Sequence, residues 1–336
     1  MTYTLMVIVG LFLVFELVWK SKYTTDNGHL FDKQNSNAMR GFWCLIVILV
    51  HIPTIYQNHI QDMLGSFAYI GVTFFFMTSA YGLKLGLIRN PESINQFWRK
   101  RLPRLLIPMF LVNIVSILFG LVKHINISLW TLVNINGWVQ WLLVCYVIFW
   151  IVNFRGGVYR DIIICILIIV FSMTVYFMKG HISSTTWCPE IFGFVWGIVF
   201  FNIKDKFAEW TEKYWFMKSC IFCVFAGIVG IAYLKFKPIV FFGDYLLKII
   251  LGALIIIFML VLNSHVIIGN KVSLFLGGIS YEVYLLHGSI FALISYLFPE
   301  INSGCFIVSS IVLTVLISYV VSLCGKWLLA RLIEIR

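Results

Sequence analysis

The sequence predicts an all-α protein, a polytopic integral membrane bundle of about eleven transmembrane helices. Hydrophobic residues make up 61% of the 336 positions, charged residues only 12%, and the mean hydropathy is +0.96. Soluble domains of this size do not have such a composition. Apolar runs such as FLVNIVSILFGLV and DIIICILIIVFSMTVYF recur along the whole chain, and each approaches the roughly 20 residues that cross a bilayer. The lipid bilayer is therefore an expected partner of this chain.

Eleven apolar segments account for the predicted helices. The first has no basic residue before its apolar run and no small-residue cleavage site after it, so we expect a retained helix and not a secretory signal. This helix and the basic loop after it, residues 1–39, form an added amino-terminal unit, and residues 40–336 form the main transmembrane domain. The segments are 2–19, 40–57, 66–88, 104–122, 138–153, 161–178, 190–203, 219–234, 246–262, 272–298 and 304–325.

The distribution of Lys and Arg predicts the orientation of the bundle. With the amino terminus outside and the carboxyl terminus in the cytoplasm, 20 of the 25 basic residues fall on the cytoplasmic side, as the positive-inside rule requires. The net charge of +11 is then a consequence of topology, and nucleic acid is not expected as a partner. The basic residues left outside are Lys123, Lys179, Lys235, Lys237 and Lys248.

The segment MRGFWCLIVILVHI, residues 39–52, carries two ionisable side chains in an otherwise apolar run. Arg40 and His51 are eleven residues apart, about three helical turns plus 20°, so both project from nearly the same face, roughly 16 Å apart along the axis. We expect Arg40 at the cytoplasmic mouth and His51 deep in the membrane, past its midplane. An ionisable group at that depth indicates a functional site. The alternative is a simple hydrogen bond to a neighbouring helix.

A second polar cluster lies in GISYEVYLLHGSIF, residues 278–291. Tyr284 and His287 are three residues apart and share one helical face, whereas Glu282 lies off that face. Under the predicted topology His287 is about as deep as His51. The two imidazoles can therefore meet at one buried site.

A basic cluster precedes the fourth segment in FWRKRLPRLLIPMF, residues 97–110. Such a cluster is what positive-inside orientation produces by itself. Arg101 and Arg104, however, are three residues apart, so a helix presents both guanidinium groups on one face, where they can bind phosphates bidentately. Together with Arg40 on the same side, they predict a polyanionic cytoplasmic ligand.

The order of these motifs resembles the membrane-bound acyltransferase family 3, which includes O-acetyltransferases of bacterial surface polysaccharides. The resemblance covers roughly residues 38–325, and its most specific part is R-x10-H. Two departures are Ala80, where the family usually has glycine, and the additional first helix. The matching motifs are R-x10-H at Arg40 and His51, FF-x-x-S ending at Ser79, the arginine pair Arg101 and Arg104, and SY-x-x-YLLH ending at His287.

The resemblance implies acyl transfer from a coenzyme A thioester, most often acetyl-CoA, to a hydroxyl, most often on a sugar. It implies that the acceptor is a cell-surface glycan or a lipid-linked saccharide, and that the protein lies in the bacterial cytoplasmic membrane. The phosphates of the acyl donor suit Arg40, Arg101 and Arg104 at the inner mouth. No metal is expected, because the seven histidines show no paired spacing within one helix.

A sugar hydroxyl needs a general base at neutral pH, and an unperturbed imidazole has its pKa near 6.5. Our hypothesis is that His51 accepts the hydroxyl proton while His287, Tyr281 or Tyr284 orients substrate or stabilises the oxyanion. Both tyrosines could instead be packing aromatics whose hydroxyls bond the backbone. A covalent acyl-enzyme on Tyr284 or Ser79 ranks below direct transfer, because the sequence places no base beside either.

Two other classes of membrane protein are alternatives. A transporter or lipid-linked glycan flippase would also have many helices and a few buried polar residues, but it would be expected to show repeat symmetry and helices broken in corresponding halves. A polysaccharide polymerase or other membrane glycosyltransferase would need larger catalytic loops. Lipid-facing and partner-facing apolar surfaces look alike in sequence, so no oligomeric state is predicted.

Overall fold

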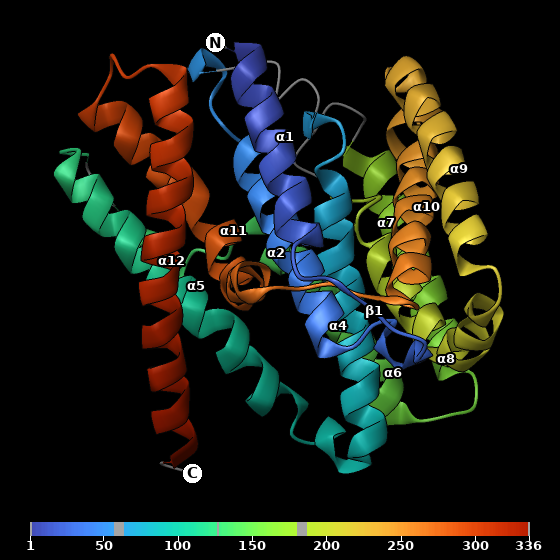
Figure 1. Cartoon of the computed structure of the whole chain (residues 1–336). Coiled ribbons are helices and arrows are strands. Elements are labelled where there is room, and N and C mark those ends of the chain that lie inside the picture. Colours follow the sequence, from blue (N-terminus) through green and yellow to red (C-terminus); the bar gives the residue numbers. More distant parts are fainter. Residues whose placement is uncertain (1, 57–63, 126–127, 180–186, 335–336) are drawn as a thin grey trace.

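The computed structural model describes residues 2–56, 64–125, 128–179 and 187–334. Its described part contains eleven α-helices, and each coincides with one predicted apolar segment, so the prediction of an all-α membrane bundle is confirmed (Figure 1). The helices are α1 (Thr2–Val18), α2 (Lys33–Val50), α4 (Tyr69–Arg89), α5 (Phe97–Val122), α6 (Gly137–Arg155), α7 (Arg160–Lys179), α8 (Phe192–Glu212), α9 (Trp215–Phe236), α10 (Lys248–Asn263), α11 (Lys271–Leu297) and α12 (Ser303–Glu334).

Short elements join the helices. The two-residue strands β1 (Lys22–Tyr23) and β2 (Val266–Ile267) pair antiparallel and connect the loop after α1 to the loop before α11. The remaining short elements are the 3-10 turns η1 (Asn27–His29), η2 (Thr54–Tyr56), η3 (Pro91–Ile94) and η4 (Leu129–Val133), and the π-helical turn η5 (Phe242–Leu247).

In the described residues, eight helical spans are long and apolar enough to cross a membrane: α4 to α7, α9, α10 together with the η5 turn before it, α11 and α12. The other three differ in length or charge. Helix α1 has only 17 residues, α2 carries Lys33 and Arg40, and α8 carries five charged residues in its second half. The last two nevertheless pack inside the bundle and contribute much of its core.

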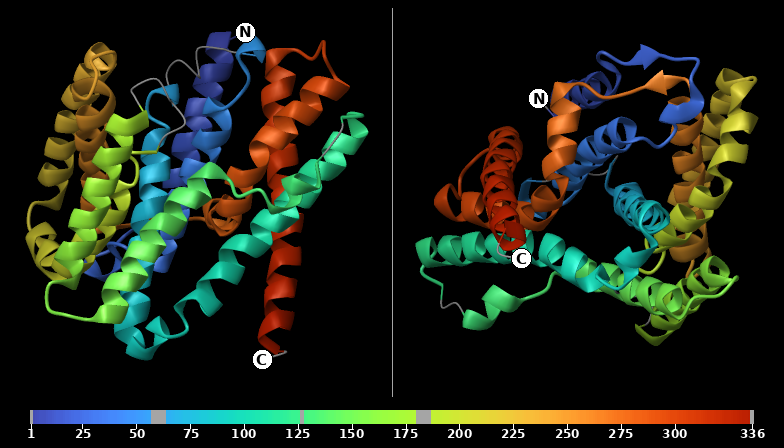
Figure 2. Two further views of the ribbon diagram at one scale, coloured as in Figure 1. Left: turned by 180° about the vertical axis from the view of Figure 1, so that it is seen from behind. Right: turned by 90° about the horizontal axis from the view of Figure 1, so that it is seen from below.

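The two ends of the bundle differ in chemistry. Helix α1 starts at one end and α12 finishes at the other, with α5 and α12 on one side of the molecule and α9 and α10 on the opposite side (Figures 1 and 2). We call the end where α4 finishes and α5 begins the basic end, since Arg89, Arg101 and Arg104 lie there. We call the end where α2 finishes, at His51, the histidine end.

The bounds of α2 correct one prediction. The helix begins at Lys33 because the Asp32 carboxylate caps it, accepting a 2.7 Å hydrogen bond from the Asn35 amide. It ends at Val50, because Pro53 disfavours helical backbone at the residue before it. His51 is thus the carboxyl-terminal cap of α2 and not a residue inside a helix that continues to residue 57. Its ring lies at the end of the helix, on an exposed position.

Glycines bring α2 and α11 into close contact. A Cβ added at Gly41 would collide with the Ser273 carbonyl oxygen, and one added at Gly277 would collide with the Asn37 carbonyl oxygen. Small residues allow membrane helices to approach backbone to backbone. This contact fixes the two helices that carry the histidines.

Helices α4 and α8 also approach each other closely at glycines. A Cβ at Gly193 would collide with the Thr73 carbonyl oxygen, and one at Gly197 with the Met77 carbonyl oxygen. Ala80 also lies against Gly197 and is fully buried. A small residue is therefore required at position 80 by the packing of α8.

Candidate functional site

Two histidines from distant parts of the chain meet at the histidine end. The ring centroids of His51, after α2, and His287, in the middle of α11, are 4.9 Å apart. His287 is 9% exposed, whereas His51 occupies an exposed position. The structure therefore brings together the two imidazoles that the sequence placed at similar depth.

Backbone contacts fix the tautomer of both rings. His51 Nδ1 lies 2.8 Å from the Val47 carbonyl oxygen, and His287 Nδ1 lies 3.2 Å from the Val283 carbonyl oxygen. A carbonyl oxygen only accepts, so each Nδ1 carries the proton and donates. In a neutral ring the proton is then missing from Nε2, which is left with a lone pair. Both histidines are thus oriented as proton acceptors.

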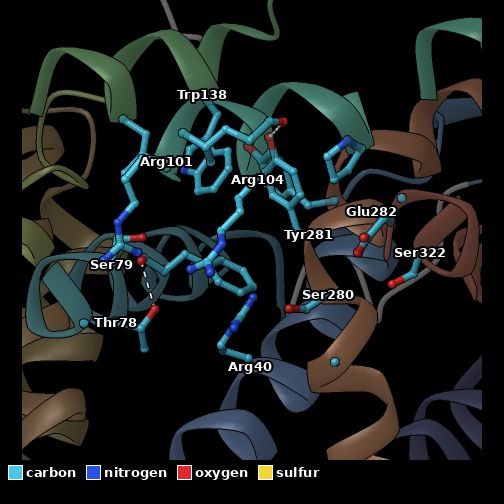
Figure 3. Close-up of a pocket in the computed structure, with 18 of the residues that line it drawn as sticks. Arg40, Thr78, Ser79, Arg101, Arg104, Trp138, Ser280, Tyr281, Glu282 and Ser322 are labelled. Atoms are coloured by element: carbon cyan, nitrogen blue, oxygen red, sulfur yellow. Dashed lines mark hydrogen bonds between the residues drawn. The ribbon is translucent and has the colours of Figure 1, made fainter. Parts of the chain in front are cut away.

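A cavity of about 380 Å³, which we call the central cavity, lies among α2, α4, α5, α6, α11 and α12 (Figure 3). Neither histidine lines it or either of the two further cavities described below. Six of the eight predicted site residues do line it: Arg40, Ser79, Arg101, Arg104, Tyr281 and Tyr284.

Three arginines surround the central cavity. Arg40 comes from α2, and Arg101 and Arg104 come from the first turns of α5, which begins seven residues earlier than predicted (Figure 3). The Arg40 guanidinium lies over the Phe75 ring, 5.6 Å from its centroid. None of the three forms an ion pair with a carboxylate among the described residues. Their positive charge is therefore available to an anionic ligand.

Arg40 also carries an unused donor. Its Nε atom is buried and has no hydrogen-bond partner in the described part of the chain. A buried N–H without a partner is costly, more so for a charged group. An anion bound in the central cavity would remove that cost.

Tyr284 lies between the central cavity and the histidine pair. It lines the cavity, while its ring is 5.0 Å from the Trp138 ring and 5.9 Å from the His287 ring, centroid to centroid. Tyr281 has a different position, because its hydroxyl donates a 3.0 Å hydrogen bond to the Leu105 carbonyl oxygen of α5. Tyr284 thus contacts both parts of the site, and Tyr281 attaches α11 to α5.

A family model described as an acyltransferase domain matches residues 33–323 of the chain. The chain belongs to acyltransferase family 3. The match confirms the family inferred from the motif order, and it runs from the start of α2 through most of α12, leaving α1 outside. No curated protein and no solved structure matches the chain.

The structure of this membrane acyltransferase adds residues that the motifs did not indicate. Glu282 was expected off the face shared by Tyr284 and His287, yet it lines the central cavity and is 7% exposed. Its carboxylate faces Ser322 of α12 (Figure 3), and Lys326 lies one turn further along α12. The charges at positions 282 and 326 were visible in the sequence. That these two side chains line the same cavity depends on how α11 packs against α12.

The described residues contain no group of three His, Cys, Asp or Glu side chains arranged to hold a metal ion. His59 and His181 lie outside the described residues. Ser79 is half-buried on the wall of the central cavity formed by α4.

Proposed function

We propose that this membrane acyltransferase is an O-acetyltransferase, which moves an acetyl group from acetyl-CoA to a hydroxyl of a cell-surface glycan or its lipid-linked precursor. The observation that carries the proposal is the histidine pair, with both Nδ1 atoms donating to backbone carbonyls and both Nε2 atoms left as acceptors. A hydroxyl acceptor requires such a base, positioned within hydrogen-bond reach.

The distribution of charge supports a cytoplasmic donor. We place the basic end in the cytoplasm, because 20 of the 25 Lys and Arg residues belong to that side. Coenzyme A is cytoplasmic and carries several phosphates, which match Arg40, Arg101 and Arg104 around the central cavity. The bacterial cytoplasmic membrane is the location consistent with this arrangement.

In the direct reaction, the acceptor oxygen attacks the thioester carbonyl as its proton passes to His51 Nε2. The carbon–sulfur bond then breaks, and the departing thiolate takes up a proton and leaves as the free thiol. Tyr284 lies where the acyl end of the donor would reach the histidine pair, so its hydroxyl is our candidate donor to the oxyanion. Tyr281 is less suited to this role, because its hydroxyl already bonds the Leu105 carbonyl.

A covalent route through Tyr284 is the second candidate, since the structure places the His287 ring beside the Tyr284 ring. Here the phenol oxygen attacks the thioester, its proton passes to His287, and the thiolate leaves. The acceptor hydroxyl then displaces the tyrosine oxygen from the acetyl group. Intact-protein mass after incubation with acetyl-CoA alone separates the routes, because this one leaves an acetyl increment that Tyr284→Phe abolishes.

The test of the proposed function uses purified protein and labelled acetyl-CoA. We expect slow thioester cleavage, or transfer of label to a glycan when cell-surface material is added, and His51→Ala should lower either rate about 100-fold or more while the protein stays monodisperse. Surface glycan from a deletion strain should lack an acetyl increment present in the parent. A transporter or flippase has no reason to cleave the thioester, so an intact thioester with wild-type protein would favour that alternative.

A further inference from the structure

A second, larger cavity lies beside the central cavity. It has a volume of about 870 Å³, and we call it the vestibule; it is lined by residues of the η1 segment, of the loop after it and of helices α2, α4 and α8. Arg40, Thr78 and Gly82 line both cavities. The central cavity and the vestibule are therefore adjacent, and these three residues lie at the boundary between them.

The central cavity alone is small for the proposed donor. Pockets for drug-sized ligands have volumes of roughly 300–1,000 Å³, and the central cavity, at about 380 Å³, is near the bottom of that range. A coenzyme A thioester combines a long flexible arm with a nucleotide that carries three phosphates. The arm suits the narrow central cavity, and the nucleotide requires a second space next to it.

The vestibule carries the charge that phosphates require. Its lining includes Lys33, Arg89 and Lys204 in addition to Arg40. One of its two carboxylates, Asp32, is already occupied, because it accepts hydrogen bonds from the Asn35 amide and from His29. The cations therefore outnumber the carboxylates, and three of the four are independent of the R-x10-H motif.

The vestibule also has an aromatic wall. Phe31, Tyr81 and Phe200 line it and contact one another, with ring centroids 4.8, 5.6 and 5.9 Å apart. Tyr81 is half-buried, so part of its ring remains accessible. Aromatic rings of this kind stack on nucleobases without sequence preference. The remaining carboxylate, Asp205, also lines the vestibule and can accept hydrogen bonds from a nucleotide.

A cavity beside α5 is the competing location. It has about 330 Å³ and is lined by Arg99, Lys100 and Arg104 together with apolar residues of α12. Its described lining contains cations but no aromatic side chain, and it is less than half the size of the vestibule. Size and aromatic character both favour the vestibule.

On the basis of the proposed function, we propose that the vestibule binds the nucleotide end of the acyl donor, an adenosine 3′-phosphate 5′-diphosphate group. The thioester arm then passes between Arg40 and Gly82 into the central cavity. A Cβ added at Gly82 would meet nothing within 4 Å, so this position is open at the junction of the two cavities. The glycine leaves room for the arm.

The first experiment compares two donors. S-acetyl-pantetheine has the thioester arm without the nucleotide, so its turnover does not depend on the vestibule. We expect Arg89→Ala with Lys204→Ala to raise the half-saturating concentration of acetyl-CoA about tenfold or more and to leave that of S-acetyl-pantetheine unchanged. The control pair Arg160→Ala with Lys206→Ala removes the same charge from exposed positions at the basic end and should leave both unchanged.

The outcomes separate this inference from the proposed function. If wild-type protein turns over neither donor, the proposed function is wrong. If wild-type protein turns over both donors, and the variant with Arg89→Ala and Lys204→Ala has the same half-saturating concentration as wild type for each donor, only the vestibule assignment is wrong. The vestibule assignment is also wrong if Arg99→Ala with Lys100→Ala, instead, raises the half-saturating concentration of acetyl-CoA and leaves that of S-acetyl-pantetheine unchanged. The nucleotide then lies beside α5.

A binding measurement tests the junction. Adenosine 3′,5′-bisphosphate represents the nucleotide end alone, and Gly82→Trp should leave its affinity within about twofold of wild type. The same variant should weaken acetyl-CoA binding about tenfold or more, because the indole blocks the path of the arm. Equal losses for both ligands, or no loss for acetyl-CoA, would contradict the proposed route.

Discussion

The basic end and the histidine end of the site are built in opposite ways. At the basic end, three arginines that form no ion pair within the described part of the chain surround hollow space, and the side chains leave volume for a ligand. At the histidine end, two rings pack against each other and their Nδ1 atoms are fixed by the backbone of their own helices. In the proposed function, one end binds the anionic donor and the other holds two bases in a defined orientation.

The helix contacts explain the difference. The histidines sit on α2 and α11, whose backbones approach closely at Gly41 and Gly277. The arginines Arg101 and Arg104 belong to α5, whose first turns have few buried residues. This close contact lies beside Arg40 and ten residues before each histidine, so it fixes how α2 and α11 sit against each other, whereas the sparsely buried start of α5 leaves room for binding. The comparison predicts different kinetic effects at the two ends.

The largest effect is expected at the histidine pair. His51→Ala and His287→Ala should each lower turnover about 100-fold or more, and the double variant should lose little beyond either single one, because residues that act as a unit are not additive. Turnover of labelled acetyl-CoA measures this, with His124→Ala, on an exposed position after α5, as the control. Additive losses would show that the two rings act separately.

The next effect is expected at the basic end and should be one of binding. Arg40→Gln, and to a smaller degree Arg101→Ala or Arg104→Ala, should raise the half-saturating concentration of acetyl-CoA about tenfold. Their maximal rates should fall less than that. If instead the maximal rate falls and half-saturation stays constant, the arginines act on the reaction, and the division between the two ends is wrong.

The smallest effect concerns the contact that positions the histidines. Gly277→Ala introduces a Cβ that collides with the Asn37 carbonyl, and overpacking of this kind costs about 1–3 kcal/mol. Gly288→Ala, on the same helix with nothing within 4 Å of its added Cβ, should be neutral or stabilising. Thermal unfolding of the two detergent-purified variants checks this. Equal unfolding temperatures would mean that the close α2–α11 contact does not limit stability.

The sequence was most informative where a property is local. Hydropathy located the eleven helices of the described residues, because burial in lipid demands apolar residues along each whole segment. It misjudged the bounds of α2, since the Asp32 cap and Pro53 act on single residues that a hydropathy pattern averages out. The ionisable residues at positions 40, 51 and 287 were recognisable because they interrupt apolar runs.

The geometry of the site was less predictable. Arg40 and His51 were expected to share a helical face, yet Arg40 lines the central cavity while His51 caps the end of α2 and contacts His287 outside that cavity. Glu282, expected off the shared face, lines the same cavity as Tyr284. A helical wheel assumes a straight helix with a single partner, whereas α11 contacts α2, α5 and α12 at different points along its length.

The sequence by itself determined the helical bundle, the family and the set of charged and imidazole side chains available for chemistry, because each of these follows directly from composition, spacing or motif order. Only the tertiary structure decided that two histidines 236 positions apart lie ring to ring while the three arginines surround a central cavity that neither histidine lines. The reason is physical: the distance between side chains on different helices depends on how closely the backbones pack, and here glycines on facing helices set that distance.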